Sequence, residues 1–296
     1  MVSVASKGSH WSWAEPLPRG EFFAGLLLLG CINGFAEKAI QCVNRLGMSD
    51  AIWSSFDISA IVWVSSFAGL SLVRQDRKNK VSNRDWVVAV GLLIPVILPV
   101  GPLSWFSVTV LSVYLFISSD DPTVRRGAII LFATTVPMLW SRLLFQLFAR
   151  VILAGDATLV GWVLGTRRVG DIVEFADGSG TLVILPSCSS LANVSLAILC
   201  WVTMSEITRH RKSILDVCWC LSACAAVVAV NVTRMSLMGI SDEYYELIHG
   251  HLGAAIVNVI ILIVTLVICS LGVRRDLYAA IFNGGNQVAS NQPYRG

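Results

Sequence analysis

Apolar residues gather in eight runs along the chain, separated by short polar segments. Most runs approach the roughly 20 residues that an α-helix needs to cross the hydrocarbon core of a bilayer. The third and fourth are shorter, and Pro99-Val-Gly-Pro102 between them predicts a tight turn at one membrane face. The pattern predicts an all-α polytopic membrane protein with about eight transmembrane helices, at residues 22–40, 52–73, 86–100, 103–118, 127–153, 188–204, 214–239 and 249–273.

The longest segment between apolar runs, residues 154–187, carries a different pattern. Apolar and polar residues alternate on both sides of an Asp177-Gly178 pair, which predicts a β-hairpin within about 166–187, with strands near 171–175 and 181–185. Strand backbone cannot satisfy its hydrogen bonds in lipid, so we expect this hairpin outside the hydrocarbon, on the extracytoplasmic side. It leads directly into the sixth apolar run.

Lysine and arginine concentrate in four of the connecting segments: 74–85, 120–126, 205–213 and 274–275. Cytoplasmic loops of membrane proteins carry an excess of these residues. Eight crossings place all four clusters on the cytoplasmic side, together with both chain ends. The prediction is a cytoplasmic segment 1–21, one integral membrane domain over 22–273, and a cytoplasmic polar tail 274–296, expected to be disordered beyond 275, in the plasma (cell inner) membrane.

Composition agrees with a membrane location. Hydrophobic residues make up 55% of the 296 residues and charged ones 14%, whereas soluble globular proteins carry about 25% charged residues. The net charge of +3 is small and sits in short clusters, which argues against nucleic-acid binding. Most of the eight cysteines lie inside apolar runs and behave there as small hydrophobes. We therefore expect neither disulfides nor a metal or cofactor, and we find no cleavable signal peptide.

Three kinds of reactive side chain are predicted at one level, near the outer membrane face. Cys188 opens the sixth run, Arg234 lies near the outer end of the seventh, and His249 and His251 open the eighth. An imidazole takes the proton of a thiol and later returns it to a leaving amine, while an arginine stabilises an oxyanion. The set therefore indicates nucleophilic chemistry at Cys188, with His249 or His251 as the base.

Each of these residues also has a structural interpretation. A lone Cys at a helix start usually packs, an Arg at a helix end usually reaches for lipid head groups, and an interfacial His often belongs to a polar belt. Two further ionisable residues, Asp57 and Arg142, are expected inside the second and fifth runs. They fit a structural ion pair, the lining of an active site, or positions nearer the interface.

The C-terminal half, about residues 125–270, resembles the exosortase/archaeosortase family of membrane-embedded cysteine transpeptidases and proteases. Three segments carry the resemblance, and they are Pro186-Ser187-Cys188-Ser189-Ser190-Leu191, Asn231-Val232-Thr233-Arg234 and His249-Gly250-His251-Leu252-Gly253. Ser190 and Gly250 depart from the family pattern, which usually has Gly and often has Asp at these places.

This resemblance implies that Cys188 is the nucleophile, Arg234 the oxyanion or thiolate stabiliser, and His249 the general base or acid. His249 is preferred over His251 because Gly253 follows it at the family's spacing. Supporting positions are His251, Arg142, Ser189 and Asn231.

The implied partners are secreted proteins with a C-terminal motif, a hydrophobic helix and a basic cluster, together with membrane lipids. The implied reaction is cleavage of that signal at the outer leaflet through a thioacyl intermediate. Two alternatives stay open from other classes: a transporter or channel that uses Asp57 and Arg142, and a non-catalytic membrane subunit of a polysaccharide or secretion system. The substrate motif, the choice between water and an amine as acceptor, and the oligomeric state also stay open.

Overall fold

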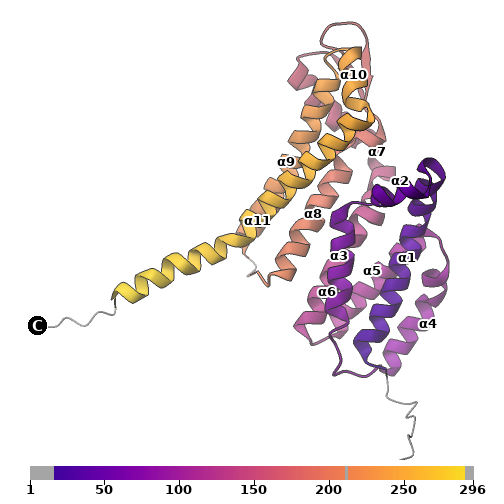
Figure 1. Ribbon diagram of the computed structural model, residues 1–296, viewed down its shortest axis with the longest axis vertical. Helices are drawn as coiled ribbons and strands as arrows, with labels where there is room; N and C mark the ends of the chain where they lie inside the picture. The colour runs from indigo at the N-terminus through magenta and orange to yellow at the C-terminus, as the bar shows by residue number, and fades with distance from the viewer. Residues whose placement is uncertain (1–16, 211–212, 291–296) are drawn as a thin grey trace, which may run out of the picture.

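The computed structural model describes residues 17–210 and 213–290 (Figure 1). The helices are α1 (Arg19–Leu46), α2 (Met48–Trp53), α3 (Ala60–Val73), α4 (Asn83–Ile97), α5 (Gly101–Ser118), α6 (Pro122–Thr135), α7 (Ser141–Leu164), α8 (Ser190–Ile207), α9 (Ile214–Met238), α10 (Asp242–His249) and α11 (His251–Ser290). Short helical turns lie at η1 (Ser55–Asp57), η2 (Val136–Trp140) and η3 (Pro186–Cys188). Three short strands complete the fold: β1 (Arg168–Val169), β2 (Ile172–Glu174) and β3 (Thr181–Val183).

Within the described residues, six helical segments are long and apolar enough to cross a membrane: Arg19–Leu46, Gly101–Ser118, Pro122–Leu164, Ser190–Ile207, Ile214–Met238 and Gly253–Arg274. The number and length of these apolar helices support the prediction of a polytopic, all-α membrane protein. The other two apolar runs form α3 and α4, which have 14 and 15 residues and are shorter than the roughly 20 that span a bilayer without help.

The N-terminal helices α1 to α6 pack around one apolar core. Its centre consists of large, fully buried side chains from α1, α5 and α6, among them Phe23, Leu27, Trp105, Leu111 and Leu131. Helices α8, α9 and α11 form a second group beside it (Figure 1). A buried hydrogen bond of 2.7 Å between the Ser65 and Thr203 hydroxyls joins α3 to α8 across the two groups. Such bonds satisfy polar groups that lipid would leave unpaired.

The fifth apolar run is longer and more bent than predicted. Helix α6 continues through the π-helical turn η2 into α7, which ends at Leu164 and not at 153. Pro137 lies in this turn and has no N–H to donate, so the regular helical ladder is interrupted there. The predicted outer segment 154–187 is therefore helical as far as Leu164, and this was missed because its polar Asp156 breaks the apolar run.

The predicted hairpin is present and gains a third strand. Strands β2 and β3 pair antiparallel with Val173 opposite Leu182, and β1 adds to the other edge of β2. Val173 and Leu182 are buried between exposed neighbours, which is the alternation seen in the sequence. The amide of Ala176 donates to the carbonyl of Gly239 at 2.9 Å, so the hairpin is fastened to the end of α9.

Three of the four basic segments, 74–85, 120–126 and the described part of 205–213, lie at the end of the molecule opposite the sheet. Arg126 at the start of α6 donates to the carbonyls of Glu206 and Ile207 at the end of α8. Pro18 forms a β-bridge with Lys80 of the loop between α3 and α4. The N-terminal end of the described chain and the turns after α3, α5 and α8 thus share one end of the bundle (Figure 1).

Three further expectations need correction. Asp57 lies in turn η1 ahead of α3, where it forms an ion pair with Arg45 and not with Arg142. His249 ends α10 and does not open the last long helix, which begins at His251. Residues 274–290 continue α11 as helix, since a formed helix extends more easily than a new one starts. Residues 1–16 and 291–296, which belong to the predicted terminal segments, lie outside the described part.

Candidate active site

Cys188 lies in the short connection between strand β3 and helix α8. It ends the turn η3, two residues before the first residue of α8, and only 7% of its surface is exposed. It packs in an apolar cluster with residues of the sheet, α7 and α9, including Val173, Ile184, Val160 and Met235.

Asn231 of α9 holds the Cys188 segment in place. Its Nδ2 donates to the Cys188 carbonyl at 2.7 Å and to the Ser190 hydroxyl at 3.0 Å, and Asn231 is 1% exposed. Ser189 caps α8 by accepting a hydrogen bond from the amide of Leu191 at 3.3 Å. The predicted supporting residues Ser189 and Asn231 therefore both contact the chain directly after the thiol, between the Cys188 carbonyl and the Leu191 amide.

Asp156 of α7 is a site residue that the sequence reading missed. Its Oδ2 accepts a hydrogen bond of 3.0 Å from the amide of Ser190, the first residue of α8, and the side chain is buried. A carboxylate at this point compensates the positive end of the α8 dipole. The available signal was an aspartate at the border of the fifth apolar run, but that stretch was interpreted as the beginning of an outer loop.

Arg234 projects from the same face of α9 as Asn231. The two residues are three apart, and Met235, four residues from Asn231, belongs to the cluster around Cys188. Arg234 is half-buried, and its Nε is fully buried without a hydrogen-bond partner among the described residues. A buried donor without a partner is costly, so a functional reason for this one is worth testing.

The two candidate histidines flank Gly250, between α10 and α11. His249 is exposed, and its ring stacks on Tyr245 with centroids 5.0 Å apart and an interplanar angle of 14°. Tyr245 in turn packs against the apolar cluster that contains Cys188. His251 is the first residue of α11, and its side chain lies outside the described part. Both histidines are thus brought to the end of the molecule that holds Cys188.

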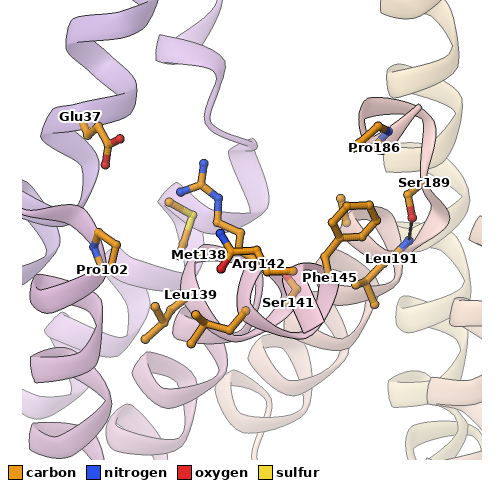
Figure 2. A pocket seen from close by; sticks show the side chains of 13 residues that line it. Glu37, Pro102, Met138, Leu139, Ser141, Arg142, Phe145, Pro186, Ser189 and Leu191 are labelled. Atoms are coloured by element: carbon orange, nitrogen blue, oxygen red, sulfur yellow. Dashed lines mark hydrogen bonds between the residues drawn. The ribbon is translucent and has the colours of Figure 1, made fainter. Parts of the chain in front are cut away.

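A cavity of about 540 Å³ lies beside this site, between α1, α5, α7 and the turn before α8 (Figure 2). Pro186 and Ser189, which flank Cys188, form one wall, and Phe145 lines the cavity while also packing on the Cys188 cluster. The opposite wall carries the carboxylate of Glu37. The site residues and the cavity therefore share the segment around Cys188.

Arg142 lines this cavity from the first turn of α7, directly after the π-helical turn. No hydrogen bond or ion pair joins it to another described side chain, although Lys38 of α1 lies within electrostatic range. Figure 2 shows its guanidinium directed between Met138 and Glu37. An unpaired arginine within a membrane-spanning segment is a functional candidate. Within the described residues, no cluster of His, Cys, Asp and Glu has the arrangement of a metal site.

No protein-family model, curated protein or solved structure matches this chain. The assignment of Cys188, Arg234 and His249 to catalytic roles consequently rests on the residues and their arrangement. The part of the arrangement that the structure describes is the Cys188 segment, its clamp by Asn231 and Asp156, the buried Arg234 Nε without a partner among the described residues, and the neighbouring cavity.

Proposed function

We propose that this protein is a membrane-embedded cysteine transpeptidase or protease with Cys188 as its nucleophile. The proposed enzyme crosses the membrane eight times, with the short helices α3 and α4 completing the count and the basic end facing the cytoplasm. Its active site then faces the exterior or periplasm at the outer leaflet. The substrates are secreted proteins whose C-terminal signal consists of a short motif, an apolar helix and a basic cluster.

The observation that carries the proposal is the clamp on the cysteine segment. Asn231 and Asp156, from two other helices, hold the Cys188 carbonyl and the Ser190 amide at 2.7 Å and 3.0 Å. A cysteine that only fills apolar space needs no such fixation, because its packing tolerates small shifts. A nucleophile does need it, since a misplacement of about 1 Å costs roughly 100-fold in rate.

The chemistry follows from the residue types. His249 or His251 removes the thiol proton, and the sulfur attacks the scissile carbonyl, so that a C–S bond forms and the carbonyl becomes an oxyanion. Arg234 stabilises this charge with its Nε–H, which has no partner among the described residues, an effect worth about 3–4 kcal/mol for one preorganised donor. The imidazolium then gives its proton to the leaving amine as the C–N bond breaks. Water or an acceptor amine afterwards attacks the thioacyl carbon and releases the thiol.

The position of the cavity supports a peptide-binding role for it. It opens beside Pro186 and Ser189, combines apolar walls with Arg142 and Glu37, and has room for several residues of an extended peptide. Substrate and enzyme helices share one bilayer, so that much of the positioning needed for the reaction is achieved before the peptide enters the site.

The test is processing of a co-expressed substrate that carries such a signal. We expect Cys188→Ala to abolish cleavage while the protein still inserts into the membrane. Cys42→Ala is the matched control, because Cys42 is a buried thiol on α1 whose one hydrogen bond to the described residues joins it to the Ser54 hydroxyl, at 3.5 Å. Unchanged cleavage in Cys188→Ala, or equal loss in both variants, refutes the assignment and favours the non-catalytic subunit.

A second candidate is a transporter, and Arg142 favours it, because this arginine lines the cavity and has no hydrogen bond or ion pair with the described residues. Transport through this cavity requires Arg142 and does not require Cys188. A substrate flux that survives Cys188→Ala and is lost in Arg142→Gln would identify this alternative.

A further inference from the structure

The basic loop between α3 and α4, residues 74–82, has a defined conformation that hydrogen bonds hold in place. The carboxylate of Asp76 is buried and accepts hydrogen bonds from the Asn79 amide at 3.2 Å and from its side chain at 3.0 Å. The loop also accepts bonds from the start of α1, with Arg19 N to Asn79 O at 2.9 Å and Gly20 N to Asp76 O at 3.0 Å. Its shape is therefore fixed by main-chain contacts to another helix.

Gly20 makes this close approach possible. A Cβ atom at Gly20 would lie 2.5 Å from the Val73 carbonyl oxygen and 2.7 Å from that of Asp76, which no side chain tolerates. The loop thus lies directly against the first turn of α1. This contact sets the place of the side chain that follows Pro18, which is Arg19.

Arg19 is a buried arginine, and two of the three nitrogens of its guanidinium donate hydrogen bonds to described residues. It exposes 7% of its surface, and its Nε and Nη2 donate to the Asp85 carboxylate at 2.9–3.1 Å, while Nη2 also donates to Ser118 at 2.6 Å. Its Nη1 makes no hydrogen bond to the described part of the chain, and Arg19 lines a cavity of about 770 Å³. Asp85 also accepts from Tyr114 at 2.8 Å, so this carboxylate is fully occupied within the protein.

The N-terminus of α4 borders the same cavity. Ser82 caps the helix, and the amides of Asn83 and Arg84 make no hydrogen bond to the described residues. Lys80 and Arg84 add two exposed ammonium and guanidinium groups without ion-pair partners in the described part. Of the two aspartates that line the cavity, Asp85 is neutralised by Arg19, and Asp120 is exposed near Arg125.

We propose that this cavity binds a phosphate group. Free helix amides, a guanidinium edge and two further cations are the donors that recognise phosphate oxygens. The phosphate belongs either to the head group of an anionic lipid in the adjacent leaflet or to a soluble phosphate. The volume exceeds that of one phosphate ion and leaves room for the rest of a head group. The inference is independent of any catalytic step at Cys188.

The test compares lipid binding to the full-length protein in detergent, by native mass spectrometry, with phosphatidylglycerol and with phosphatidylcholine as probes. The double variant Lys80→Gln/Arg84→Gln removes two cavity charges. Arg77→Gln/Lys78→Gln removes two exposed charges from the same loop that do not line the cavity. We expect the first variant to weaken phosphatidylglycerol binding about tenfold and the second to change it less than twofold.

Equal weakening in both variants would overturn the proposal, because binding would then follow only the net charge of the surface. No weakening in either would overturn it as well. Inorganic phosphate distinguishes the two sources. The lipid is the ligand if Lys80→Gln/Arg84→Gln weakens phosphatidylglycerol binding and if millimolar phosphate does not displace phosphatidylglycerol from the parent protein. A soluble phosphate is the ligand if inorganic phosphate displaces the lipid, or if phosphate binds without lipid and this binding requires Lys80 and Arg84.

Arg19→Lys tests the buried part of the site. It keeps a positive charge beside Asp85 but lacks the planar fork and its free edge. We expect weaker phosphatidylglycerol binding and unchanged phosphatidylcholine binding. If this variant does not fold, the exposed pair Lys80 and Arg84 still decides the question, because its replacement disturbs no described hydrogen bond or ion pair of these side chains.

Discussion

Removal of the Asn231 side chain is the sharpest test of how the Cys188 segment is held. In Asn231→Ala, the hydrogen bonds to the Cys188 carbonyl and the Ser190 hydroxyl are lost together. Asn231 is 1% exposed, so water does not readily replace it. A buried carbonyl left without a partner costs about 1–3 kcal/mol, and the second bond contributes about 0.5–1.5 kcal/mol.

The free energy for local opening of the Cys188 segment should therefore fall by roughly 2–4 kcal/mol. Each 1.4 kcal/mol is a factor of ten, so a reaction that requires opening should accelerate roughly 30- to 1000-fold. The assay is the rate of Cys188 alkylation by a maleimide that cannot cross the membrane, in protein whose other cysteines are replaced. We expect the thiol to react slowly in the parent protein, because only 7% of the Cys188 surface is exposed.

Thr233→Ala supplies the control on the same helix. Thr233 is exposed, and its hydroxyl has one hydrogen bond to the described residues, a donation to the carbonyl of Ala229 in its own helix at 2.8 Å. The reasoning fails if Asn231→Ala leaves the alkylation rate unchanged, or if Thr233→Ala accelerates it equally. A matching fall in the overall thermal midpoint would show that the whole fold, and not the segment, had loosened.

Three other predictions concern separate parts of the molecule. Arg234→Lys should lower processing at least tenfold in single-turnover assays, because a point charge replaces the planar fork. Gly34→Ala should lower stability by about 1–3 kcal/mol, measured by thermal unfolding, since its Cβ would lie 2.6 Å from the Trp105 indole. Burial opposes the ionisation of Asp85, but hydrogen bonds, first that of Arg19, hold its pKa below the usual 3.8. Asp85→Asn should therefore cost about 3–5 kcal/mol at neutral pH, a gap that closes as the pH falls below 3.8 through the folded-state value.

Each of these predictions has a contrasting result. Near-normal processing by Arg234→Lys would reduce Arg234 to a membrane anchor. Gly25→Ala is the control for Gly34, because a Cβ at Gly25 meets no atom within 4 Å. Equal losses in the two glycine variants would show that helix propensity, and not the contact with Trp105, decides. A gap for Asp85→Asn that stays constant from pH 7 to pH 3 would mean that the ionised carboxylate contributes nothing.

Some residues of the candidate site were predicted from sequence motifs, and others were found only in the structure. Cys188, Asn231 and Ser189 were singled out from short motifs, and the structure brings them together. Asp156 was not, since a single buried aspartate at the edge of an apolar run reads as the start of a loop. Its partner, the Ser190 amide, is 34 residues away, and nothing local announces that contact.

The sequence alone determined the apolar segments, the hairpin at 172–183 and the gathering of the basic loops at one end. These features depend on local length, hydropathy and alternation, which the membrane constrains residue by residue. Tertiary structure decided the rest: the pairing of Asp57 with Arg45, the place of His249 at the end of α10, the clamp on Cys188 and both cavities. Such features arise where side chains from distant helices meet. The packing that brings them together depends on several segments at once, so no single segment predicts it.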